Sequence, residues 1–148
     1  MGRIVRGLVS GAAGTLALNA VTYADMAVRG RPASTTPEQS VQRLADATGI
    51  DLGDGEKAGN RRAGLAPLLG YATGVGVAVG YALLVPRRLS WPATAGLLGG
   101  GAMIAANAPM TVLRITDPRR WTPADWLSDA VPHLAYGVAA ALVANRMW

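Results

Sequence analysis

Long stretches of the chain carry apolar residues without a polar face, and this pattern predicts helices that cross a membrane. Residues 63–86 and 89–113 contain no Asp, Glu, Lys or Arg. Each run exceeds the ~20 helical residues that cross a hydrocarbon core. Residues 7–24 form a weaker apolar run, and a fourth run begins at residue 126. We therefore predict four spans, near residues 7–28, 63–85, 91–115 and 124–146.

Two alternatives to four membrane spans follow from the same pattern. A soluble helical bundle would need a polar face on each surface helix, and the two central runs have none. The first run could instead be a signal peptide, because MGRIVRG precedes apolar and small residues. Asn19 and Tyr23 fit the apolar core of a signal peptide poorly, so we predict a retained span. The expected fold is an all-α, integral-membrane four-helix bundle, with residues 1–148 in a single domain.

The longest polar segment, residues 29–62, is predicted to lie outside the membrane. The stretch TPEQ at residues 36–39 is typical of a helix start, with a threonine N-cap, a proline at the first position and a glutamine that closes a capping box. Gly49 is a favourable C-cap. We therefore expect a short amphipathic surface helix near residues 37–48. The stretch TPAD at residues 122–125 repeats this pattern and predicts a second capping box before the last span.

The two halves of the chain resemble each other. Three landmarks occur in the same order in both: Asn-Ala at 19 and 107, Thr-Pro at 36 and 122, and PLLGYA at 67–72 with PHLAYG at 132–137. Two parallel-repeated helical hairpins would explain this order, as in some transporters. Pairs of glycines four residues apart let helices approach closely, and they occur at Gly7/Gly11, Gly70/Gly74, Gly76/Gly80 and Gly96/Gly100. We expect a homo-oligomer, with a dimer as the favoured form, or a complex with a partner membrane subunit.

The charge of the chain, +5 at neutral pH, lies at the ends of the predicted spans. The end with both termini holds five arginines and no acidic side chain: Arg3, Arg6, Arg87, Arg88 and Arg146. The density of positive charge favours cytoplasmic termini in the cell membrane, whereas the raw count of basic residues favours the opposite orientation. Charge in these places indicates the lipid bilayer as a partner, and nucleic acid is not expected.

Polar side chains interrupt all four predicted spans at a similar depth, close to one membrane face. His133 is the only histidine of the chain, and Asp129 precedes it by one helical turn, a spacing that permits contact. Ionisable groups inside a span normally face the bundle interior or a water-filled cavity. The candidate ligand-binding residues are Asn19, Asp25, Tyr71, Asn107, Arg114, Asp129, His133 and Tyr136.

Three functions agree with this pattern. The first is a small transporter, channel or carrier whose polar cavity is protonated through His133, near neutral pH if water reaches it. The second is a structural or accessory subunit whose glycine faces bind partner helices and whose polar residues only join helices. The third and least favoured is an intramembrane enzyme with His133 and Asp129 as acid–base groups. No cofactor or metal is predicted, because one histidine with dispersed aspartates is a poor metal site.

The last span, WLSDAVPHLAYG at residues 126–137, resembles the histidine-bearing final span of YagU-type inner-membrane proteins. Over its whole length the chain resembles a small family of actinobacterial four-span membrane proteins. These resemblances imply a multi-pass protein of a bacterial cell membrane. They imply no activity, and therefore no site residue.

Overall fold

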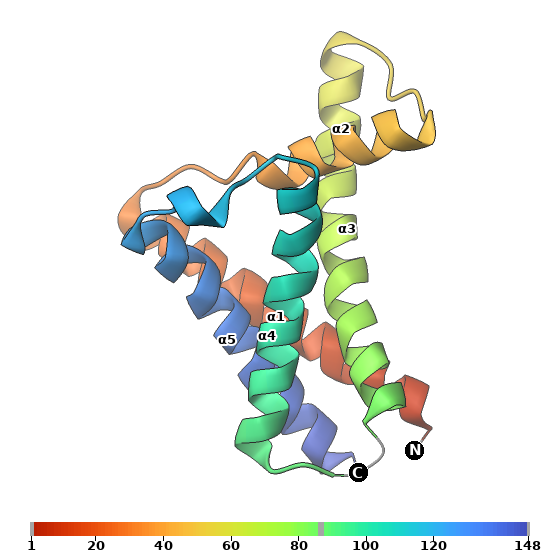
Figure 1. Cartoon of the computed structure of the whole chain (residues 1–148), viewed down its shortest axis with the longest axis vertical. Helices are drawn as coiled ribbons and strands as arrows, with labels where there is room; N and C mark the ends of the chain where they lie inside the picture. Colours follow the sequence, from red (N-terminus) through yellow and green to blue (C-terminus); the bar gives the residue numbers. More distant parts are fainter. Residues whose placement is uncertain (1, 86–87, 148) are drawn as a thin grey trace.

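The computed structural model describes residues 2–85 and 88–147, and over these residues the chain is helical without a strand (Figure 1). The elements are α1 (Arg3–Arg29), α2 (Thr36–Thr48), α3 (Gly55–Leu84), α4 (Trp91–Val112), the short 3-10 helix η1 (Pro118–Arg120) and α5 (Pro123–Arg146). Four of them, α1, α3, α4 and α5, are long and apolar enough to cross a membrane. The prediction of an all-α four-helix membrane bundle is therefore confirmed.

The four long helices alternate in direction along the chain. α1 contacts both α3 and α5, and α4 contacts α5. In Figure 1, α1 crosses obliquely behind the upright α3 and α4. The start of α1, the end of α3, the start of α4 and the end of α5 lie together, and we call this the terminal end of the bundle. The opposite end, with α2 and η1, is the loop end. Arg87, assigned to the terminal end from the sequence, lies outside the described residues.

Small residues hold α1 against α3. A Cβ atom on Gly7 would lie 2.5 Å from the Cα atom of Val79, and one on Gly11 would lie 2.7 Å from the Cα atom of Val75. Real Cβ atoms do not come so close to backbone, so both positions require glycine for this contact. The buried core of the bundle also consists mostly of small side chains, which let the helices approach closely. Its residues are Ala78, Tyr81, Ala95, Leu98, Ala102, Tyr136, Ala140 and Ala141.

The outward faces of the four long helices are apolar. One large side chain from each is at least 61% exposed: Leu16, Leu68, Ile104 and Leu134. In water, the exposure of so many large apolar side chains would be unfavourable or would bind a partner. Acyl chains cover these side chains without that cost, so the outside of the bundle is suited to a lipid bilayer.

α2 packs on the first turns of α3, at the loop end. The contact buries a small apolar cluster of Val41, Ala45, Leu52, Ala58 and Ala66, and Arg62 Nη1 donates a hydrogen bond to Gln42 Oε1 at 2.8 Å. α3 begins at Gly55, earlier than the span predicted from residue 63, because its first turns pack against α2. Thirty helical residues extend ~45 Å, so α3 projects beyond a hydrocarbon core of ~30 Å.

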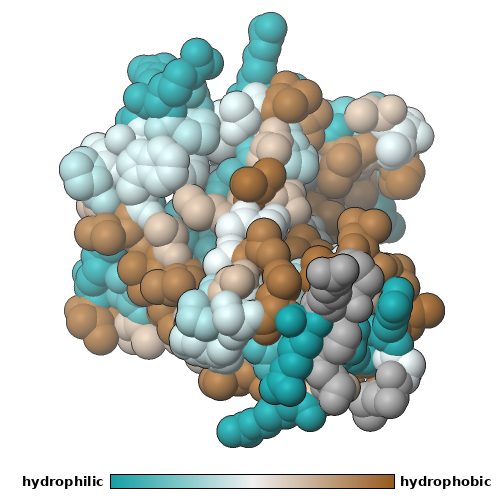
Figure 2. All heavy atoms as spheres, turned by 60° about the horizontal axis from the view of Figure 1, so that its bottom comes forward, coloured by the Kyte–Doolittle hydropathy of each residue, from teal (hydrophilic) through white to brown (hydrophobic). Residues whose placement is uncertain are grey.

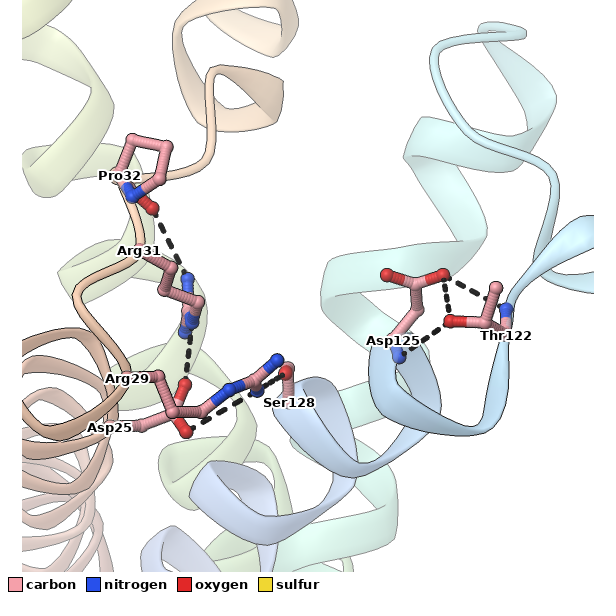
Figure 3. Close-up of polar contacts among 7 residues, drawn as sticks. All are labelled: Asp25, Arg29, Arg31, Pro32, Thr122, Asp125 and Ser128. Atoms are coloured by element: carbon pink, nitrogen blue, oxygen red, sulfur yellow. Dashed lines mark hydrogen bonds and ion pairs between the residues drawn. The ribbon is translucent and has the colours of Figure 1, made fainter.

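The two predicted capping boxes differ in outcome. At α5 the box is formed: Thr122 Oγ1 accepts from the Asp125 N–H at 3.3 Å, and Asp125 Oδ2 accepts from the Thr122 N–H at 2.9 Å (Figure 3). At α2 the prediction was wrong, because Thr35 rather than Thr36 is the N-cap. Thr35 has helical backbone angles, whereas a capping residue is extended. Gln39 Nε2 donates to the Thr35 hydroxyl at 3.0 Å, whereas in a capping box the side-chain oxygen of Gln39 would accept from the backbone N–H of the N-cap residue.

This difference predicts unequal effects of two threonine substitutions. Thr122→Ala removes a side-chain cap and should lower the free energy of unfolding by ~1 kcal/mol. Thr36→Ala, the matched control, removes a hydroxyl that caps no helix N–H and should change it much less. Denaturation of both variants in the same detergent measures the two effects, and equal losses would contradict the assignment of the box to α5 alone.

Candidate functional site

Three of the eight candidate residues meet between α4 and α5, and we call Asn107, Asp129 and His133 the α4–α5 cluster. Asn107 Nδ2 donates a hydrogen bond to Asp129 Oδ2 at 2.8 Å. His133 Nδ1 lies 2.7 Å from the backbone carbonyl oxygen of Asp129 and 3.5 Å from its carboxylate oxygen Oδ1. The predicted contact between His133 and Asp129, one turn apart, is therefore present, and Asn107 joins it from the neighbouring span.

The hydrogen bond of His133 determines which ring nitrogen is available for chemistry. A carbonyl oxygen can only accept, so Nδ1 carries the hydrogen in this contact. Nε2 is then the nitrogen that gains or loses a proton and can meet a ligand. The side chains of His133 and Asp129 are 11% and 22% exposed, so both groups are largely removed from the surface inside a membrane-spanning helix.

Two glycines bring α4 close enough to α5 for this cluster to form. A Cβ atom on Gly99 would lie 2.9 Å from the carbonyl oxygen of His133, and one on Gly137 would lie 2.8 Å from the backbone nitrogen of Gly99. Both contacts are closer than real Cβ atoms allow. Asn107 lies about two turns beyond Gly99 on the same helix, which places its amide opposite Asp129.

Asn19 and Tyr71 form a separate contact between α1 and α3. Asn19 Nδ2 donates to the Tyr71 hydroxyl at 3.3 Å, and Tyr71 is 40% exposed. No hydrogen bond or ion pair among the described residues joins this contact to the α4–α5 cluster. The aligned asparagines of the two halves also have different partners, because Asn19 bonds a tyrosine and Asn107 bonds Asp129. The internal repeat stays a prediction.

Asp25 lies at the loop end, between two arginines. Its Oδ2 accepts from Arg31 Nε at 2.6 Å, and its Oδ1 lies 3.4 Å from Arg29 Nη1. Figure 3 shows Arg29 reaching from α1 to Ser128 of α5, where Nη1 donates to Oγ at 2.8 Å. These side chains tie the two helices together at the rim of the bundle. The sequence pattern indicated Asp25 as a candidate residue, but it did not predict the hydrogen bond from Arg29 to Ser128.

Tyr136 belongs to the core rather than to a polar cavity. It is 1% exposed, and its hydroxyl donates a hydrogen bond to the carbonyl oxygen of Gly74 on α3. Its ring lies so close to Gly14 that a Cβ atom there would be 2.6 Å from the tyrosine Cδ2 atom. Tyr136 therefore joins α5 to α1 and α3.

Arg114 follows the end of α4, outside the helix. Its φ of 55° is left-handed, and Arg114 N–H and Ile115 N–H bond the carbonyl oxygens of Thr111 and Met110 at 3.1 and 2.9 Å. This is the Schellman pattern, with arginine at a position usually held by glycine. α4 therefore ends at Val112 rather than near residue 115 as predicted.

Two open pockets lie at the two ends of the bundle. The one at the loop end, of about 580 Å³, is lined by charged side chains that include Arg114, Asp117 and Arg120. The backbone N–H and then the guanidinium of Arg119 lower the pKa of the Asp117 carboxyl there. The pocket at the terminal end measures about 530 Å³. Neither pocket is lined by the α4–α5 cluster or by Asn19.

A buried polar pair that the sequence pattern did not single out joins α3 to α4. The Tyr81 hydroxyl and Thr94 Oγ1 lie 3.1 Å apart, and Thr94 is fully buried. Hydroxyl side chains within otherwise apolar runs were the available signal. Among the described residues, no three or more His, Asp or Glu side chains lie close enough together to hold a metal ion.

Comparisons with models of protein families, with curated proteins and with solved structures found no match to the chain. The resemblance to actinobacterial four-span proteins and to YagU-type proteins therefore stays a prediction.

Proposed function

We propose that the protein is a small transporter, channel or carrier of the cell membrane that handles a small ion or polar molecule at the α4–α5 cluster. The proposal is supported by an ionisable pair, His133 and Asp129, that lies inside the span α5. Asn107 of the neighbouring span α4 donates a hydrogen bond to this pair. Such groups are unfavourable in a membrane unless they interact with one another or with a substrate. The density of arginine at the terminal end supports cytoplasmic termini.

The chemistry of the cluster favours a small cation. With Asp129 ionised and His133 neutral, the cluster carries one negative charge, and Asp129 keeps free lone pairs beside its bond from Asn107. When Nε2 of His133 takes a proton, the positive charge of the ring cancels that negative charge. A cation held by the carboxylate is then released, so binding of the cation and of the proton oppose each other.

Flux into liposomes tests this function. The full chain is reconstituted, and uptake of small cations is screened at several pH values. We expect one cation to be taken up, with a rate that falls as the pH is lowered. His133→Ala should remove the pH dependence, and Asp129→Asn should reduce uptake at every pH. Gly100→Ala is a suitable control, because a Cβ atom there meets no atom within 4 Å.

A structural subunit is the second candidate function, because the cluster residues pair directly and line neither pocket. The predicted glycine pairs Gly76/Gly80 and Gly96/Gly100 also face open space, where partner helices or a second copy could pack. In that case His133→Ala lowers stability by the ~0.6–2 kcal/mol of an intramembrane hydrogen bond, no cation is taken up, and Gly100→Leu disrupts an oligomer that light scattering detects.

A further inference from the structure

The pocket of about 530 Å³ lies where the start of α4 meets the last turn of α5. Arg88, Ser90 and Trp91 line it on the α4 side, and Leu142, Asn145 and Arg146 line it on the α5 side. Figure 2, which turns the terminal end forward, shows hydrophilic side chains beside hydrophobic ones at this end of the bundle. The pocket thus combines two arginines with an apolar wall.

No acidic side chain from the spans compensates the arginines of this pocket. Residues 1–24, 57–116 and 130–148 contain no Asp or Glu, and these ranges supply the terminal end of all four long helices. Arg88 and Arg146 are both exposed. Their potential therefore attracts an anion from outside the chain.

The start of α4 adds to this attraction. Ser90, its N-cap residue, makes no side-chain bond to the helix, which leaves the first backbone N–H groups of a 22-residue helix without a side-chain cap. The positive end of a helix dipole and free N–H groups favour an anion. The two arginines and the helix start therefore act in the same direction.

The position of the pocket indicates which anion it meets. Trp91 and Leu142 are 41% and 43% exposed, and tryptophan at the end of a span is typical of the boundary between hydrocarbon and headgroups. Phospholipid phosphates lie at this level. Asn145 also contributes, because its Oδ1 atom is buried without a hydrogen-bond partner in the described part of the chain, and a donor hydroxyl would satisfy it.

We propose that this pocket binds the headgroup of an anionic phospholipid, with its phosphate at Arg88 and Arg146 and a glycerol hydroxyl at Asn145. The phosphate supplies the charge that the two arginines lack, and basic pockets between spans bind anionic headgroups in this way. The apolar wall at Trp91 and Leu142 receives the start of the acyl chains. This site is separate from the α4–α5 cluster and does not depend on the proposed transport function.

Native mass spectrometry of the full chain in detergent tests the site. The protein is titrated with phosphatidylglycerol, phosphatidic acid and phosphatidylcholine that have the same acyl chains. We expect phosphatidylglycerol to bind most tightly. Phosphatidic acid should bind less tightly, because it lacks the headgroup glycerol and its hydroxyls, and phosphatidylcholine should bind least tightly. Arg88→Gln and Arg146→Gln should each weaken binding of phosphatidylglycerol about fivefold. Both side chains are exposed, so their replacement leaves the packing of the bundle unchanged.

Arg3→Gln is the matched control, because Arg3 carries the same charge at the same end but does not line the pocket. It should leave the affinity unchanged. Equal affinities for phosphatidylglycerol and phosphatidylcholine would overturn the proposal, as would an Arg3→Gln loss as large as that of Arg146→Gln. Displacement of the lipid by an equal concentration of glycerol phosphate would also overturn it, because the site would then belong to a free anion.

Discussion

Replacement of Tyr136 by alanine is expected to lower the free energy of unfolding by ~3–5 kcal/mol, the range found when large aromatic side chains are removed from a core. The side chain is 1% exposed, and its ring fills the space beside Gly14 and Gly74. In a membrane the loss comes mainly from contacts that no other atom replaces. Denaturation in mixed micelles, followed by circular dichroism, measures it.

Two further tyrosine variants separate the ring from its hydroxyl. Tyr136→Phe keeps the ring and removes only the hydrogen bond to the Gly74 carbonyl, so its cost should be ~0.6–2 kcal/mol. Tyr23→Ala removes a side chain that is 60% exposed and should cost little. If Tyr136→Ala were no more harmful than Tyr23→Ala, Tyr136 would not be the residue that joins α5 to α1 and α3.

Gly137→Ala is the second large effect, although it adds only one carbon atom. The new Cβ atom would lie 2.8 Å from the backbone nitrogen and 2.9 Å from the Cα atom of Gly99. Backbone cannot rotate away as a side chain can, so α4 and α5 must separate. Overpacking of this kind costs ~1–3 kcal/mol, and separation also weakens the bond between Asn107 and Asp129.

The matched control is again Gly100→Ala, one position from Gly99 on α4. A Cβ atom at Gly100 meets nothing within 4 Å, and alanine favours a helix over glycine by ~1 kcal/mol. Its thermal midpoint should therefore be equal to or above that of the unchanged chain, while that of Gly137→Ala falls. A fall of similar size in both variants would mean that α4 and α5 do not pack through Gly99 and Gly137.

The four long helices could be predicted from the sequence because an apolar run of this length is typical of a helix that crosses a membrane. Their ends were less predictable. α3 starts at Gly55 because its first turns pack against α2, which is a tertiary contact, and α4 ends early because Arg114 adopts a left-handed conformation usually held by glycine. At α2 the threonine of the capping pattern was misassigned by one residue, because Thr35 is itself helical.

The candidate site was predictable only where its residues are neighbours along one helix. Asp129 and His133 are one turn apart, so their contact follows from helix geometry. Which neighbour each polar side chain meets depends on how helices rotate against one another, and glycines such as Gly99 and Gly137 determine that. For this reason Asn107 reaches Asp129, whereas Asn19 meets Tyr71 and Tyr136 enters the core.

In the proposed function, the α4–α5 cluster exchanges protons with water from inside a span. His133 is the only histidine, so histidine labelled with ¹⁵N gives signals from this site alone when the chain is studied by NMR in bilayers. We predict that Nδ1 carries a hydrogen at every pH, and that the Nε2 signal changes when the pH of the buffer is lowered. An Nε2 signal that shows a bound hydrogen at every pH, or that does not change with the pH of the buffer, would contradict the account.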